Sequence, residues 1–193
     1  MATAEIHSVQ TVSGNQPRMR RIIEEAAQTF LSGTPVVIAS GDGGLQAWAG
    51  VNNTVIAGFS KEAANNLAAL GVTPTASVNP TPQPSSGSVP FETSAVNITR
   101  PFFRDGRVGL EVADSDTVFQ GQVGPSQTAV ASDVGKPYGM TIDADNHWYV
   151  DRTKSTSGTN TLVTIVKLDP NDQSATPRGV YFVVQAALSQ LVA

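Results

Sequence analysis

The 193-residue sequence contains no cysteine, and this absence sets the first limit on what the protein can be. Disulfides and thiolate metal sites are excluded, which is typical of a chain that folds in a reducing cytosol, and a virus particle assembled there would look the same. Charged residues are also scarce, at 15% of the chain against roughly 25% in ordinary domains. Ser, Thr, Asn, Gln and Gly take their place.

Positive charge is the scarcer sign, and the net charge is −4. Only Arg18, Arg20 and Arg21 form a cluster, and a short charge run of this kind is usually a solvated face rather than a phosphate site. The electrostatic footprint of a nucleic-acid-binding protein is therefore missing, and we expect no direct contact with nucleic acid.

Long apolar segments are missing as well. The opening MATAEIHSVQ has no basic start followed by an apolar core, so we expect no signal peptide. No run is long and apolar enough to span a membrane, and we expect no membrane partner.

The usual signatures of catalysis do not occur. The two histidines, His7 and His147, lie far apart, and no GxSxG motif supplies a nucleophile. GDGG at 41–44 lacks both the GK(S/T) of a phosphate loop and the spacing of a dinucleotide motif, so it predicts a turn. Glu24 and Glu25 are adjacent and point to different faces, unlike a general acid/base couple. We therefore name no catalytic, cofactor-binding or metal-binding residue and expect a protein that is not an enzyme and has no cofactor.

One acidic segment comes close to a metal-binding motif. Asp143, Asp145, His147 and Asp151 invite comparison with a calcium loop, but His147 and Trp148 stand where an oxygen ligand and the required glycine should be. We interpret DADN in this segment as a turn that joins two strands.

What the sequence does contain is β-forming residues, most clearly in 135–185. DNHWYVD, TLVTIVKLDP and RGVYFVVQ are rich in Val, Ile, Tyr, Phe and Thr and are separated by turn-forming residues, which predicts a β-meander. Strand side chains alternate between faces, and in 161–168 and 180–186 both faces are largely apolar. Such strands need cover from a second layer or from another subunit.

The N-terminal third is less clear. Residues 1–16 predict an extended arm or an edge strand with Ile6, Val9 and Val12 as anchors, and we expect the arm to become ordered only against a partner. In 17–31 the apolar residues follow a helical period, with Pro17 near the start and Gly33 just past the end. The alternative is a strand at 28–31 that turns through SGT into a strand at 35–39, so residues 18–31 remain open between helix and strand.

The next segment predicts a hairpin closed at 41–44, short strands at 45–51 and 54–59 around Asn52-Asn53, and a short helix at 61–70. Ser60 is a good N-cap for that helix and Gly71 a good stop. Residues 73–90 carry five prolines and no apolar period, which indicates a linker.

We therefore divide the chain into an N-terminal arm and β-rich lobe at 1–72, a Pro/Ser-rich linker at 73–90, and a C-terminal domain at 91–193. Asp105-Gly106 gives the strongest hairpin signal in the chain. A second turn at Asp114-Ser115-Asp116 leads into TVFQGQV. The fold class that follows is mainly β, with a β-barrel or sandwich as C-terminal domain, a β-rich N-terminal lobe and one or two short helices.

From about residue 24 onward, the chain resembles the small structural proteins of tailed-bacteriophage heads, the capsid decoration or cement class, in these runs: EEAAQTFLSGTPVVI, VIAGFSKEAANN, GLEVADSDTVFQGQV, ASDVGKPYGM, WYVD and LVTIVKLDP…GVYFVV. The resemblance implies a non-enzymatic virion protein on the capsid surface, assembled in the host cytoplasm, with the major capsid protein as partner. In that class the protein binds the outside of the capsid lattice, often as trimers, and stabilises the shell. The resemblance also favours an extended conformation for 26–31.

The two apolar strand faces and the resemblance together lead us to expect a homotrimer. The alternative function is a receptor- or glycan-binding head or tail appendage, in which loops such as 153–160 and 170–178 contact a host sugar. Trp48 and Trp148 could stack on sugars, although a lone Trp in a strand is usually a core residue.

Overall fold

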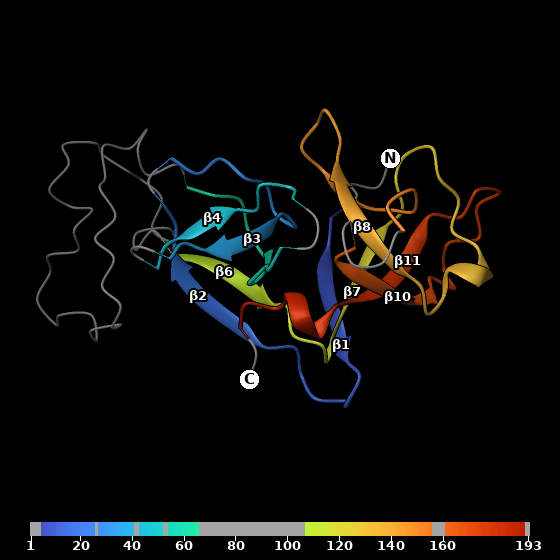
Figure 1. Cartoon of the computed structure of the whole chain (residues 1–193), viewed down its shortest axis with the longest axis horizontal. Helices are drawn as coiled ribbons and strands as arrows, with labels where there is room; N and C mark the ends of the chain where they lie inside the picture. Colours follow the sequence, from blue (N-terminus) through green and yellow to red (C-terminus); the bar gives the residue numbers. More distant parts are fainter. Residues whose placement is uncertain are drawn as a thin grey trace, which may run out of the picture.

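Two antiparallel β-sheets contain nearly all the regular structure of the described residues in this computed structural model of the protein (Figure 1). The structure describes residues 5–25, 27–40, 43–51, 54–65, 107–155 and 161–191. The only helices in these ranges are two single 3₁₀ turns, η2 (Ala131–Asp133) and η3 (Ala186–Leu188). The predicted mainly β class is therefore confirmed.

The larger sheet has six strands in the order β1-β7-β11-β10-β8-β9. Their bounds are β1 (His7–Thr11), β7 (Thr117–Gln122), β8 (Pro137–Ile142), β9 (Trp148–Asp151), β10 (Val163–Leu168) and β11 (Gly179–Val184). The three strands predicted within 135–185 are confirmed, but the predicted meander is wrong. The hairpin of β8 and β9 closes first, and β10 then returns beside β8 instead of β9.

The smaller sheet has five strands in the order β2-β6-β5-β3-β4. Their bounds are β2 (Met19–Ile23), β3 (Pro35–Ile38), β4 (Leu45–Ala47), β5 (Gly58–Ser60) and β6 (Arg107–Val112). Ile38 pairs with Leu45, so β3 and β4 form the predicted hairpin. Gly43, within its connection, has a φ of 76°, a conformation that suits glycine.

The helix expected over 17–31 is replaced by β2 and an irregular segment. All five residues of β2 pair with β6, and this long-range pairing overrides the local helical period. The apolar residues of the expected helical stripe do not share one buried face. Ile22 packs on the core of the smaller sheet and Phe30 is buried, whereas Met19 and Leu31 are exposed. Within 18–31 the structure therefore has a strand at 19–23, whereas the alternative strand expected at 28–31 is not formed.

The helix expected at 61–70 is wrong for its described part, since residues 61–65 are not helical. Ser60 is not an N-cap but the last residue of β5. Its buried hydroxyl donates to the Leu31 carbonyl at 2.8 Å and accepts the Thr34 N–H at 3.1 Å. Ser60 thus fixes the turn that precedes β3, through hydrogen bonds to residues that are distant in the sequence.

Each sheet takes strands from both sides of residues 73–90. β1 lies at one end of the larger sheet, and β6 lies in the smaller sheet between β2 and β5. The sheets therefore do not follow the division expected at 73–90. That segment, the turns at Asn52-Asn53 and Asp105-Gly106, and the stop at Gly71 lie outside the described residues.

The described part of the N-terminal arm is held by the chain itself, which corrects the expectation that only a partner would order it. β1 is an edge strand paired with β7, and Ile6 is buried in the main core. The N–H of Val12 donates to the Asp116 carbonyl at 2.7 Å. Val9 and Val12, the other two expected anchors, are exposed.

One apolar core joins the two sheets. Phe59 of the smaller sheet contacts Phe119 and Phe182 of the larger one, with ring centroids 4.6 and 5.9 Å apart, and all three side chains are fully buried. Trp48 and Trp148 make a second contact between the sheets at 5.1 Å. Their expected place in the core is confirmed. The shared core is that of a sandwich-like fold.

The second face of the predicted two-faced strands is only partly covered within the chain. In β11, Val180, Phe182 and Val184 are buried and Tyr181 and Val183 are half-buried. In β10 a bulge between Ile165 and Lys167 breaks the alternation and leaves Val166 exposed.

Candidate functional site

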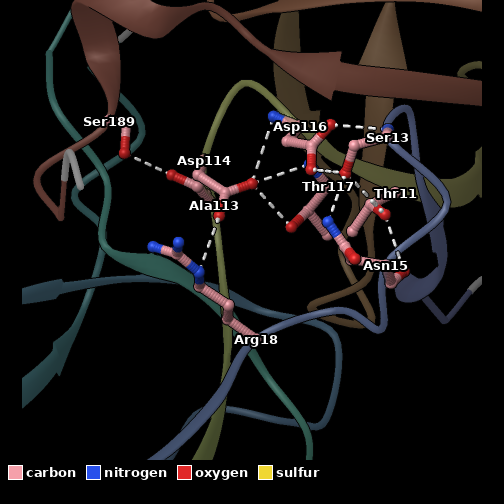
Figure 2. Close-up of polar contacts among 9 residues, drawn as sticks. All are labelled: Thr11, Ser13, Asn15, Arg18, Ala113, Asp114, Asp116, Thr117 and Ser189. Atoms are coloured by element: carbon pink, nitrogen blue, oxygen red, sulfur yellow. Dashed lines mark hydrogen bonds and ion pairs between the residues drawn. The ribbon is translucent and has the colours of Figure 1, made fainter.

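A polar hollow of about 220 Å³ lies where the chain passes from the smaller sheet to the larger one. It is lined by Thr11, Asn15, Gln16, Arg18, Asp114, Ser115, Asp116, Ala186 and Ser189. The predicted turn at Asp114-Ser115-Asp116 is confirmed, and it connects β6 to β7 across the two sheets. Figure 2 shows that the side chains of Ser13, Arg18 and Asp116 converge on this connection.

The two carboxylates of the hollow are used by the chain itself. Asp114 Oδ1 accepts three hydrogen bonds, from the N–H of Asp116 and from the N–H and hydroxyl of Thr117, at 2.7–3.1 Å. Asp116 accepts from the N–H and the hydroxyl of Ser13, which fixes the turn after β1 (Figure 2). The hydroxyl of Ser189 donates to the Ala113 carbonyl. These bonds tie β1, the crossover and the C-terminal segment together.

Arg18 is the one lining residue of the hollow that carries positive charge. Its Nε lies 4.0 Å from Asp114 Oδ2, and its side chain is 58% exposed. An ion pair of that length in solvent contributes little, so the guanidinium retains most of its capacity to donate to a polar or anionic group.

The acidic segment of the β8–β9 connection forms the predicted turn. Asp143 Oδ1 accepts the N–H groups of Asp145 and His147, each at 2.9 Å, and Oδ2 accepts the Tyr149 hydroxyl at 2.8 Å. The His147 bond in particular lowers the pKa of the Asp143 carboxyl. One ligand atom each of Asp143, Asp145 and His147 lies within 4.8 Å of the others. Asp151 lies at the far end of β9, where its carboxylate binds Gln127 and Thr153 instead.

A buried polar cluster that the sequence did not reveal lies beside η2. Asp133 accepts the Val130 N–H at 2.9 Å, the Tyr138 hydroxyl at 2.8 Å and the Arg152 guanidinium at 2.9 Å. Burial raises the pKa of the Asp133 carboxyl, but these hydrogen bonds together outweigh burial and lower it. The cluster fixes the 130–134 segment against β8 and the end of β9, and no local spacing signals it.

The loop at 170–178, one of the expected glycan contacts, is organised by Asp172. Its Oδ2 accepts the N–H groups of Arg178 and Gly179 at 2.6 and 2.8 Å, and Oδ1 accepts the Ser174 hydroxyl at 2.7 Å. The Arg178 bond, the Gly179 bond and the Ser174 bond lower the pKa of Asp172 to about 2. This loop contains no aromatic residue, and both tryptophans are buried, so these parts of the chain offer no stacking platform for a sugar.

We expect Asp172 to make the free energy of unfolding depend on acid pH. Its folded-state pKa lies below the ordinary value of 3.8, so the stabilisation is present above about pH 4 and is lost as the pH falls toward about 2. Asp172→Asn removes the charge and should flatten the curve in this window, as measured by denaturant unfolding at a series of pH values. Asp145→Asn, at an exposed turn position, serves as the control. An unchanged slope in Asp172→Asn would contradict the assignment.

Large apolar side chains are exposed on both sheets and on the segments around them. They are Val9, Val12, Met19, Leu31, Val51, Val55, Val130, Val134, Ile142 and Val166. Two of these valines, Val134 and Val166, belong to neighbouring stretches of backbone, because the N–H of Gly135, which follows Val134, donates to the carbonyl of Ile165, which precedes Val166. The described surface therefore presents aliphatic contacts in addition to hydroxyl and amide groups.

Comparison with known proteins identifies no relative: the chain matches no protein-family model, no curated protein and no solved structure. Among the described residues, no helix has the length and apolar character needed to cross a membrane.

Proposed function

We propose that the protein is a non-enzymatic structural protein of a phage virion, which binds the outer surface of the capsid lattice and stabilises the shell. Its partner is the major capsid protein, and assembly takes place in the host cytoplasm. The proposal draws on the resemblance in the sequence runs from about residue 24 onward. The mainly β fold, with two sheets locked by a common core, supports it as a rigid body suited to surface contact.

The observation that carries the proposal is the set of aliphatic side chains exposed on both sheets. Exposed apolar side chains among hydroxyl and amide groups are what a protein that binds through broad surface contact presents. A lattice multiplies each such contact, since many copies bind equivalent positions and a bridging copy holds neighbouring subunits together.

The engagement of the carboxylates supports the same function. Asp114, Asp143 and Asp172 each accept backbone N–H groups within their own turns, and Asp116 accepts the N–H of Ser13 in the turn after β1. Carboxylates used in this way stabilise loop shape, which surface recognition requires. We therefore propose that the protein acts by binding the surface of another protein.

We expect the protein to raise the temperature at which capsids that lack it release their DNA. A ligand that binds the assembled shell more tightly than its separated subunits stabilises the shell by mass action. Released-DNA fluorescence during heating of bare and decorated capsids measures the effect, and bound protein is quantified by sedimentation. An unchanged release temperature at saturated binding would refute the stabilising role.

The oligomeric state belongs to this proposal. We propose a homotrimer, in solution or on the lattice, because Val166, Val183 and Tyr181 keep the second face of β10 and β11 incompletely covered within one chain. Light scattering measures the oligomeric state of the free protein, and the number of copies bound per capsid measures it on the lattice. A monomer both in solution and on the capsid would contradict the trimer. It would leave the separate test of the release temperature unaffected.

A further inference from the structure

The edge of β2 presents unpaired backbone groups. The N–H of Val112 donates to the Arg18 carbonyl at 3.0 Å. Hydrogen-bonded and non-hydrogen-bonded pairs alternate along an antiparallel ladder, so the backbone groups of Arg20 and Ile22 also bond to β6. The groups of Met19 and Arg21 therefore point away from β6. The structure gives these outward N–H and carbonyl groups no partner within the described residues.

Each of the other three end strands has at least one backbone group bonded to a segment outside its paired strand. In β9 the Val150 carbonyl accepts the Gly124 N–H at 3.0 Å. In β4 the Leu45 carbonyl accepts the Glu25 N–H at 2.9 Å, and the Ala47 N–H donates to a side chain. In β1 the Ser8 N–H donates to the Glu111 carboxylate. For β2 alone, the described residues supply no such bond to the outward backbone groups, and natural sheets protect or use open edges.

The open edge is also positively charged. Arg20 forms no ion pair with a described residue and is exposed, Arg18 is held only at 4.0 Å, and Arg21 is 52% exposed beside Glu62 at 3.4 Å. This charge stands out in a chain with a net charge of −4. Met19 adds a half-exposed apolar contact, with 48% of its surface in solvent.

Charge decides which strand fits this edge. A second copy of β2 would bring arginines opposite or diagonal to arginines, and like charges at those positions destabilise a strand pair. A strand with carboxylates would instead form charge-assisted contacts with Arg18 and Arg20 while its backbone bonds to Met19 and Arg21. We propose that the edge of β2 binds an extended acidic polypeptide segment of a partner protein as an added strand.

This binding mode does not depend on the partner being a capsid, so it can fail or succeed separately from the proposed function. The probe is a fluorescent peptide of about eight residues, a usual strand length with flanks, in which glutamate alternates with valine and threonine. We expect it to bind the full chain in an anisotropy titration. The same peptide with lysine for glutamate, or with N-methylated backbone amides on its pairing edge, should bind at least about tenfold more weakly.

Two variants test the protein side of the contact. Met19→Pro removes an outward N–H at an edge position that tolerates proline, and Arg20→Glu reverses the charge; each should weaken binding about tenfold or more. Lys167→Glu, at an exposed position of β10, makes the same change in net charge and should leave binding unchanged. Thermal unfolding checks that each variant is folded, and Arg20→Glu remains informative if Met19→Pro is not.

Three outcomes would overturn the proposal. Failure of the acidic peptide to bind at any concentration reached would mean that the arginines act only as guards against edge-to-edge aggregation. Equal binding of the N-methylated peptide would show attraction by charge without strand pairing. Equal weakening by Lys167→Glu would show that net charge alone governs the interaction.

Discussion

Replacing Phe59 by alanine should lower the free energy of unfolding by about 3–5 kcal/mol, the usual cost of deleting a fully buried phenylalanine. Phe59 lies on β5 of the smaller sheet, and its ring packs against Phe119 and Phe182 of the larger sheet. The cavity would open at the contact between the sheets, where neither sheet can close it without moving relative to the other. Chemical denaturation followed by circular dichroism measures the loss.

Phe59→Leu is the matched control, because leucine keeps most of the apolar volume and should cost much less. Tryptophan fluorescence adds a second readout, since Trp48 and Trp148 face each other at another contact between the sheets. If the sheets depend on the Phe59 contact, both probes should report one earlier transition in Phe59→Ala. A loss below about 1 kcal/mol would mean that the core repacks and that the aromatic cluster is not what joins the sheets.

Gly58→Ala is expected to have an effect of similar size for a different reason. A Cβ at this position would clash with the Glu111 carbonyl oxygen and would lie 2.8 Å from a Leu110 methyl group. Backbone cannot yield as a flexible side chain does, so β5 and β6 would have to separate at their pairing. We expect a loss of about 3 kcal/mol or more, measured by thermal or denaturant unfolding.

The control for Gly58 is Gly109→Ala on the neighbouring strand. There the nearest atoms to an added Cβ are Lys61 Cβ and Glu62 Oε1, at 3.3 and 3.4 Å, so a shift of a few tenths of an ångström would accommodate it. A stable Gly58→Ala protein would show that β5 and β6 are spaced more widely than described. Similar losses in both variants would point to a general cost of side chains in this sheet.

Local patterns predicted the strands well and their partners poorly. Runs rich in β-branched and aromatic residues located β9, β10 and β11, and turn residues located the Asp114–Asp116 crossover and the β8–β9 connection. Pairing depends on residues far apart in the chain, so the insertion of β6 between β2 and β5 leaves no mark on the nearby sequence. The same long-range pairing turned the helical period of 17–31 into β2.

The candidate binding surfaces were also predictable only in part, because their composition is local but their position depends on strand pairing. The arginine cluster at 18–21 is visible in the sequence, but its position on an open edge follows only from the register of β2 on β6. The Asp133 cluster could not be predicted, because Tyr138 and Arg152 approach the carboxylate through the fold of β8 and β9. The exposed state of Val166 likewise depends on a bulge in the pairing of β10 with β11.

The position of β6 makes the smaller sheet open to exchange between molecules. β6 follows β5 only through the long connection 61–106, yet it fills the place between β2 and β5. Any second chain could insert its own β6 there with identical contacts, which is the condition for domain swapping. A swapped pair would keep every strand partner of the monomer while linking two copies through their connections. Exchange of β6 between two copies would therefore require no new strand pairing.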